Sequence, residues 1–247
     1  MKFLLFALSL TILTSCSKNN NSTSTQDTCN KIVEVLEQQN YTYQTTATLT
    51  FDGQGRVKTV LGQGQNKTDY TYYNDSIVIK ATDIYGVDIT SVLYLDNLHR
   101  VIKTKFSNPE YTYNNEGYLI SYKQAYGNNG QIFGYTQYFL TWQNGNLTLL
   151  YTNDANASMK KVTFQYYNLP NQNLLGYNSP FFIGDILYDR NSFFLLEGLF
   201  FGKQSKDLLK SVNFNDTNQS SDIGYSSDST GRIINSGSYY KFKYQCP

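Results

Sequence analysis

The chain has few of the side chains that usually build metal sites and catalytic triads. Its 247 residues include one histidine, three cysteines, four prolines and one tryptophan, and only 16% are charged. One histidine leaves little material for a zinc site or a His-based triad. A net charge of +1 lacks the basic footprint of a nucleic-acid-binding protein. We therefore expect no metal, no cofactor, no nucleic-acid partner and no enzymatic activity.

Long apolar runs are also scarce, and the clearest one opens the chain. Lys2 precedes an apolar run from Phe3 to Leu13, which is too short to span a bilayer and has the length of a signal-peptide core. The run ends in Leu-Thr-Ser before Cys16, which resembles the lipobox of bacterial lipoproteins. This resemblance implies that residues 1–15 are a cleaved signal peptide and that Cys16 carries the lipid, with acyl chains such as palmitate. A plain secretory signal with an incidental cysteine is the alternative.

Two further cysteines lie at the ends of the remaining chain. Residues 16–28 comprise the lipidated cysteine and a polar stretch, which predicts a flexible tether because it cannot bury apolar surface. Residues 29–247 are long enough for a single all-β domain. Cys29 and Cys246 would form a disulfide in an exported compartment if both ends of the domain lay on neighbouring strands. Two unrelated buried thiols are the other possibility.

Most of this domain alternates with a period of two residues. Its runs are rich in Thr, Tyr, Val and Ile, which favour strands. A turn of the pattern Asp/Asn-x-x-Gly-Arg recurs between them; it is complete at residues 52–56 and 228–232, has His for Gly at 96–100 and has Tyr for Arg at 114–118. Such short turns join antiparallel neighbours. We therefore predict an all-β fold, a curved antiparallel meander of many short strands forming an open or closed barrel-like sheet.

The turns also account for the lone histidine. Gly55, Gly117 and Gly231 occupy the turn position that predicts positive φ, and His99 stands at that position in the remaining copy. Histidine tolerates the left-handed region better than most residues. His99 is therefore interpreted as a turn residue rather than a ligand or a general base. Asn144 and Gly145 predict a type I′ turn.

One segment departs from the strand pattern. The residues at 193–201 are apolar nearly all round, and they predict one short buried helix that ends at Gly202 and covers an open end of the sheet. A patch that faces lipid or a partner is the alternative.

Several features together resemble a known family. They are the lipobox, the repeated Tyr-Thr-Tyr strands with their Gly-Arg turns, and the segments 141–148, 166–173 and 200–208. In their order they resemble the Bacteroidota lipoproteins of unknown function that are described as having a porin-like fold. The resemblance covers about residues 29–244 and implies a curved antiparallel sheet that closes or nearly closes, but no known activity. Because lysines fall inside the strand candidates, we expect attachment to the outer membrane by lipid alone, on its surface or its periplasmic face.

The 23 tyrosines suit both sheet cores and recognition surfaces. In each Tyr-x-Tyr strand the two rings share one face of the sheet. That face would either form part of the core or form an exposed aromatic stripe. The sets are Tyr70/Tyr72, Tyr111/Tyr113 and Tyr240/Phe242/Tyr244. The leading hypothesis is a non-enzymatic cell-envelope lipoprotein that binds a glycan, a peptide or an envelope partner, or has a structural role. The alternatives are a lipid-handling protein that holds an acyl chain in the curved sheet and, third, a hydrolase with paired carboxylates.

Overall fold

The protein is described by a computed structural model at residues 31–39, 42–62, 67–82, 87–104, 110–128, 131–154, 161–172, 200–215, 219–237 and 240–245. Strands dominate these residues and pair antiparallel in two sheets, so the predicted all-β class is confirmed. The predicted signal peptide, Cys16, the tether, Cys29 and Cys246 lie outside the described residues. In the described part, no helix is long and apolar enough to cross a bilayer.

The first sheet contains ten strands, and every neighbouring pair is antiparallel. In spatial order they are β15 (Tyr225–Ser227), β16 (Ile233–Ser236), β17 (Tyr240–Gln245), β1 (Lys31–Gln39), β2 (Thr42–Phe51), β3 (Val57–Gly62), β4 (Lys67–Tyr72), β5 (Ser76–Thr82), β6 (Asp88–Leu95) and β7 (Val101–Thr104). The strand that ends the domain therefore pairs with the strand that begins it.

The second sheet contains seven strands, again all antiparallel. In spatial order they are β14 (Gln219–Asp222), β13 (Asp207–Phe214), β12 (Lys161–Pro170), β11 (Asn146–Thr152), β10 (Gln131–Gln143), β9 (Leu119–Asn128) and β8 (Tyr111–Tyr113). Among the strands that the structure describes, neighbours in this sheet are consecutive in the chain, as the predicted meander requires.

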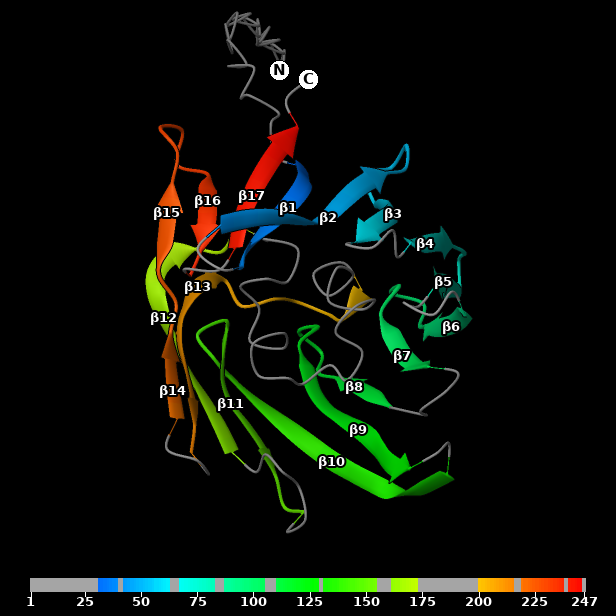
Figure 1. Ribbon diagram of the computed structural model, residues 1–247. Coiled ribbons are helices and arrows are strands. Elements are labelled where there is room, and N and C mark those ends of the chain that lie inside the picture. Colours follow the sequence, from blue (N-terminus) through cyan, green and yellow to red (C-terminus); the bar gives the residue numbers. More distant parts are fainter. Residues whose placement is uncertain are drawn as a thin grey trace, which may run out of the picture.

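The two sheets curve around a common interior but do not form one closed barrel (Figure 1). An isolated bridge between Lys103 and Glu110 is the backbone pairing between the end of β7 and the start of β8. On the opposite side, β14 and β15 follow one another in the chain but belong to different sheets. Of the predicted open and closed forms, the open form is the one observed.

The pairing of β1 with β17 bears on the predicted disulfide. Lys31 is the register partner of Gln245, so the two ends of the domain lie on neighbouring antiparallel strands. This is the arrangement under which a bridge between Cys29 and Cys246 is expected. The bridge itself stays a prediction.

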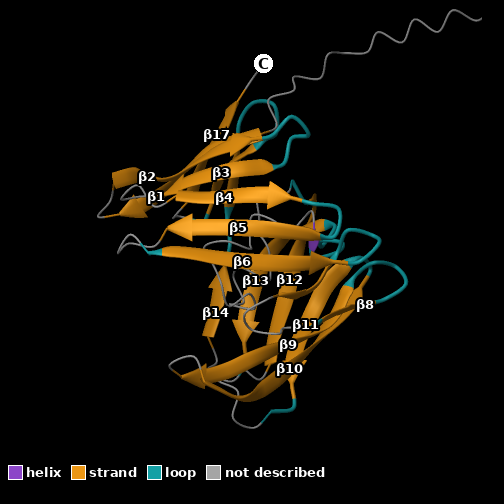
Figure 2. Ribbon diagram, turned by 90° about the vertical axis from the view of Figure 1, so that its right-hand side faces the viewer, coloured by secondary structure: helices purple, strands orange, loops and turns teal. Residues whose placement is uncertain are grey.

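The repeated turns lie mostly along one side of the molecule, where Figure 2 shows the loops in teal. In residues 52–56 the backbone N–H groups of Gln54 and Arg56 donate to the Asp52 carboxylate, and the Gly55 N–H donates to the Asp52 carbonyl oxygen. Gly55 has a φ of 80°. The same bonds recur in the other copies of the turn.

The predicted left-handed turn residues are confirmed. Gly117 and Gly231 have φ values of 91° and 84°. His99 has a φ of 58°, and its N–H donates to the Asp96 carbonyl oxygen, as the glycine N–H does in the other turns. Asn144 and Gly145 both have positive φ, at 51° and 80°, which is the requirement of a type I′ turn.

Residues 200–206, named the strap here, cross the turn side of the second sheet. The Lys203 N–H donates to the Gly117 carbonyl oxygen at 2.9 Å, and the Lys206 N–H donates to the Gly145 carbonyl oxygen at 3.0 Å. The predicted burial is confirmed for Phe200 and Phe201. Residues 193–199 of the predicted helix lie outside the described residues.

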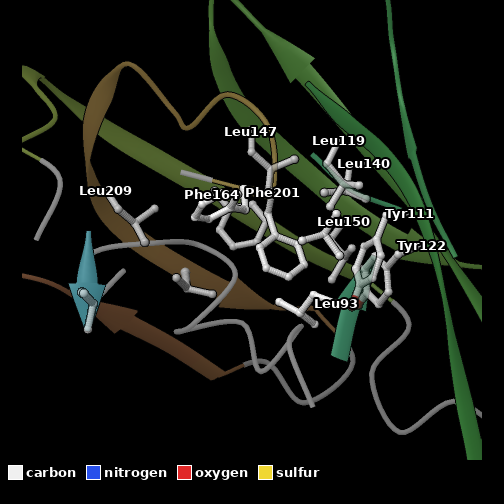
Figure 3. Close-up of a cluster of buried hydrophobic side chains, with 14 of the residues drawn as sticks. Leu93, Tyr111, Leu119, Tyr122, Leu140, Leu147, Leu150, Phe164, Phe201 and Leu209 are labelled. Carbon is white, nitrogen blue, oxygen red and sulfur yellow. The ribbon is translucent and has the colours of Figure 1, made fainter. Parts of the chain in front are cut away.

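The strap fills the space between the sheets with two phenylalanine rings. Phe201 is 1% exposed and lies in a cluster to which Leu93 of the first sheet and Leu119 and Leu150 of the second contribute (Figure 3). Its ring meets the Tyr111 ring edge-on at 5.2 Å. Phe200 stacks on Tyr72 of the first sheet at 5.7 Å. Burying each ring stabilises the fold by about 2–3 kcal/mol, so the strap holds the two sheets together.

We expect Gly202→Ala to destabilise the protein by about 2–3 kcal/mol, measured by denaturant unfolding. Gly202 has a φ of 84°, and an added Cβ would lie 2.6 Å from the Gly117 carbonyl oxygen and 2.9 Å from a ring carbon of Tyr113. The substitution therefore combines backbone strain with a steric clash.

Two other glycines separate these causes. Gly231 has the same φ of 84° with no atom near the added Cβ, so Gly231→Ala should cost about 1 kcal/mol from strain alone. Gly53 has neither feature, and Gly53→Ala should be neutral or stabilise by about 0.5 kcal/mol. Equal losses at Gly202 and Gly231 would show that the strap is not tightly packed on the turn.

Candidate binding surface

Tyrosine hydroxyls close the turns that contain an arginine. The Tyr72 hydroxyl donates to the Val57 carbonyl oxygen at 2.6 Å. The Tyr113 hydroxyl donates to Val101 at 2.7 Å, and the Tyr244 hydroxyl donates to Ile233 at 2.7 Å. In each case the acceptor is the residue that follows the arginine of the turn. The ring therefore ties the start of one strand to its neighbour.

The same hydrogen bond, from an aromatic side chain to a backbone carbonyl oxygen, also occurs at turns that have no arginine. The Trp142 Nε1–H donates to the Leu119 carbonyl oxygen at 2.7 Å, and the Tyr166 hydroxyl donates to Leu147 at 2.7 Å. The Tyr225 hydroxyl of β15 donates to the Leu209 carbonyl oxygen of β13 at 2.8 Å. This last bond joins the first sheet to the second, as does the bond of Tyr113 in β8 to Val101 in β7.

The arginine of each turn lies over the same tyrosine. The distances from the guanidinium carbon to the ring centroid are 4.1 Å for Arg56 on Tyr72, 4.5 Å for Arg100 on Tyr113 and 5.5 Å for Arg232 on Tyr244. Each guanidinium also pairs with the first aspartate of its turn, at 2.7 or 2.8 Å. Carboxylate, guanidinium and ring thus form one compensated unit at each turn.

The aspartates of these units are held in their charged form. Burial raises the pKa of the Asp52 and Asp96 carboxyls, but hydrogen bonds from the following arginine and from turn N–H groups outweigh it, so both pKa values lie below the ordinary range. A hydrogen bond from the Thr230 hydroxyl, with others from Arg232, lowers the pKa of Asp228 to about 2, although burial acts in the opposite direction.

The tyrosines that the sequence singled out are structural. Tyr70, Tyr111 and Phe242 are buried in the core. Tyr72, Tyr113 and Tyr244 form the turn contacts, and Tyr240 packs against the core. The core interpretation of these strands is therefore the one observed, and these rings do not form an open stripe.

We expect Tyr244→Phe to weaken the loss of stability at alkaline pH. Burial raises the pKa of Tyr244 to about 12, although nearby Arg232 lowers it, whereas an unfolded tyrosine titrates near 10. The folded state therefore keeps the phenolic proton of Tyr244 to a higher pH than the unfolded state does. The resulting contribution of Tyr244 to the free energy of unfolding is complete below about pH 10 and is lost as the pH rises towards 12.

The measurement is denaturant unfolding at several pH values between 8 and 12. Tyr244→Phe should cost about 1 kcal/mol at pH 8 and show a shallower decline above pH 10. Tyr73→Phe is the matched control, because Tyr73 is 57% exposed. If Tyr244→Phe had the same pH profile as the unaltered protein, the raised pKa assigned to Tyr244 would be wrong.

Strand β10 carries aromatic residues on both faces. Tyr138 and Leu140 are buried, and the Tyr138 ring stacks on Tyr122 at 4.9 Å. The alternate residues Tyr135 and Phe139 lie on the other face, and Tyr135 is 46% exposed. Aromatic side chains therefore remain on the outside of the second sheet after its core is complete.

We name this surface the outer aromatic face and define it as Tyr135, Gln137, Phe139 and Tyr151. Phe139 and Tyr151 are register partners on β10 and β11, and their rings stack at 5.3 Å with an interplanar angle of 29°. The partner of Gln137 on β9 is Lys123, which pairs with Glu110 at 3.0 Å. The face thus combines aromatic rings with an amide group and neighbouring charges.

The sequence did not identify this face. The available signal was that β10 alternates aromatics in both registers, so one of its aromatic sets had to face outward. The alternation alone does not show which of the two aromatic sets faces outward, because that depends on which side of β10 the core lies.

The carboxylates of the described residues mostly have cationic, hydroxyl or amide partners. Glu34 pairs with Lys243 at 2.7 Å, Asp154 accepts from the Thr136 hydroxyl at 2.7 Å, and Asp207 accepts from the Asn146 amide at 2.8 Å. Within the same part of the chain, no cluster of three or more His, Cys, Asp or Glu forms a metal site. Glu197 lies outside the described residues.

Comparison with known proteins points to the same architecture. A porin-like protein from Bacteroides uniformis superposes with a TM-score of 0.61 over 89% of this chain and 99% of that one, at 13% sequence identity. A porin-like protein from Bacteroides vulgatus gives a TM-score of 0.54 over 87% of this chain and 98% of that one, at 12% identity. No protein-family model matches the chain, and no curated protein matches it in sequence. The chain therefore has the all-β fold of these porin-like proteins.

Proposed function

We propose that the protein is a non-enzymatic cell-envelope lipoprotein that binds a glycan on its outer aromatic face. The observation that carries this proposal is the division of the aromatic side chains. Most of the tyrosines that the sequence singled out lie in the core or close a turn, whereas Tyr135 with the stacked pair of Phe139 and Tyr151 remains outside. Rings that add nothing to the core are the ones available to a ligand.

A glycan fits this surface better than a purely apolar partner. Ring faces of tyrosine and phenylalanine pack on the C–H faces of sugars, and amide and hydroxyl groups bond to sugar hydroxyls. Tyr135, Gln137 and Phe139 follow one another on one face of β10, at intervals of about 7 Å. An extended sugar chain lying along the strand would meet ring, amide and ring in turn.

The envelope location rests on the N-terminal sequence and on the fold. The lipobox at Cys16 and the polar tether that follows it imply a lipid anchor. The similar structures are porin-like proteins of Bacteroides, which supports an envelope role for this fold. We therefore propose attachment to the outer membrane through Cys16, with residues 29–247 as the binding domain.

The lipid-handling alternative receives less support. An acyl chain would need open apolar space between the sheets. Where the described interior meets the strap, Phe164, Phe201, Leu147 and Leu150 pack together in that space (Figure 3). The outer surface is therefore the better candidate for binding.

The test is a glycan array with the detergent-solubilised full chain, followed by calorimetry on the glycans it retains. The double variant Tyr135→Ser/Tyr151→Ser should bind at least about tenfold more weakly, because it removes two ring contacts of about 1 kcal/mol each. Its melting temperature should change little, since neither ring is in the core.

Tyr73→Ser is the control, because Tyr73 is an exposed tyrosine of the first sheet's turns. It should bind as the unaltered protein does. An array with no bound glycan would overturn the proposal, and so would equal affinity of the double variant and the control.

A further inference from the structure

The strap and two of the repeated turns border a shallow, open hollow of about 430 Å³, which could seat one ring of a surface-bound sugar. Leu98 and Arg100 of one turn, Glu116 and Gly117 of the next, and Lys203 and Gln204 of the strap line it. It lies where β7 meets β8, away from the outer aromatic face.

The charge at this hollow differs from that at the other turns. At residues 52–56, 96–100 and 228–232 the cation over the ring belongs to an arginine that is neutralised by the first aspartate of the turn. In residues 114–118 the first position is Asn114 and the arginine position is Tyr118. This turn therefore contains neither member of the usual ion pair.

Tyr118 packs on the ring of Trp142 where the other turns have an arginine, and the strap supplies the nearby cation. The Lys203 ammonium lies 5.4 Å from the centroid of the Tyr118 ring, which packs on Trp142 at 4.5 Å. Asn114 is neutral, and the carboxylate that this turn does contain, Glu116, lies beyond ion-pair distance of Lys203. Across the described ranges Lys203 forms no ion pair, and its side chain is exposed. Among the described residues that line the hollow, Lys203 and Glu116 are thus a cation and a carboxylate that each lack an ion-pair partner.

The other groups define what a ligand needs besides a negative charge. Arg100 uses Nε and Nη2 for Asp96, which leaves its other amino group without an assigned acceptor. Glu116 is exposed, lies beyond ion-pair distance of both cations, and offers an acceptor for hydroxyl groups. Its charge disfavours ligands with several negative charges. Leu98 is 65% exposed and provides an apolar edge for a sugar ring.

The backbone argues against capture of a peptide carboxylate. Such capture commonly uses a nest of unpaired N–H groups. In this hollow the N–H groups of Glu116 and Tyr118 donate to the Asn114 side chain, and those of Gly117 and Lys203 donate to carbonyl oxygens. These four N–H groups are therefore not available to a carboxylate, which favours recognition by the side chains.

We propose that the hollow binds a uronic acid residue of an acidic polysaccharide, with its single carboxylate between Lys203 and Arg100 and its hydroxyls on Glu116 and Gln204. This inference does not depend on the outer aromatic face. A ligand of this kind matches the ammonium of Lys203, the hydroxyl acceptor Glu116, the amide of Gln204 and the apolar edge of Leu98.

The experiment is calorimetry of the full chain with methyl galacturonide, which carries one carboxylate, and with methyl galactoside, its carboxyl-reduced counterpart, which has the same ring skeleton without the charge. The acid should bind at least about tenfold more tightly than the reduced sugar, and the difference should shrink as the salt concentration rises from 0.05 to 0.5 M. Lys203→Gln should remove this difference without weakening the reduced sugar.

Two further variants serve as controls. Lys206→Gln alters another exposed strap lysine, which lies 3.8 Å from Asp207 and outside the hollow, and it should leave both affinities unchanged. Leu98→Asn should weaken both sugars alike, because it removes the ring contact. Equal affinity for the two sugars, no effect of Lys203→Gln, or tighter binding of a peptide with a free C-terminus would each overturn the inference. Tyr135→Ser should leave sugar binding at the hollow unchanged. The inference about the hollow therefore stands or fails independently of the proposed function.

Discussion

The hydrogen bond from a tyrosine hydroxyl to a backbone carbonyl holds this fold together where strand pairing stops. Both boundaries between the two sheets are crossed by one: Tyr113 reaches Val101 at one boundary, and Tyr225 reaches Leu209 at the other. A tyrosine spans more distance than a backbone pair, so it tolerates the change of direction there. Each bond contributes about 1 kcal/mol, and the buried ring beneath it contributes more.

The same contact explains how such a fold accommodates very different sequences. The donor must be a tyrosine or tryptophan, but the acceptor is a main-chain oxygen, which every residue possesses. Val57, Leu147 and Ile233 all accept such a bond here. Half of each contact is therefore indifferent to side-chain identity. The superposition at 12–13% identity with porin-like proteins is compatible with an architecture specified this loosely.

Local chemistry made much of the fold predictable from the sequence. The Asp-x-x-Gly-Arg pattern predicted antiparallel hairpins, and it also predicted a left-handed backbone at His99, because each turn is stabilised by residues within five positions. The division into two sheets, the outward face of β10 and the position of Lys203 over Tyr118 depend on residues far apart in the chain. The sequence showed that Asn114 and Tyr118 break the turn pattern, but not which residue would compensate for them.

The pairing of β1 with β17 has a consequence for how the chain is completed during synthesis. Strand β1 lies between β2 and β17, so one of its two edges stays open until the last strand of the domain has emerged. Contacts between such distant segments form slowly, because a long loop must close first. In a chain that emerges from N-terminus to C-terminus, this edge of β1 therefore stays unpaired, and open to chaperones and proteases, until β17 has emerged.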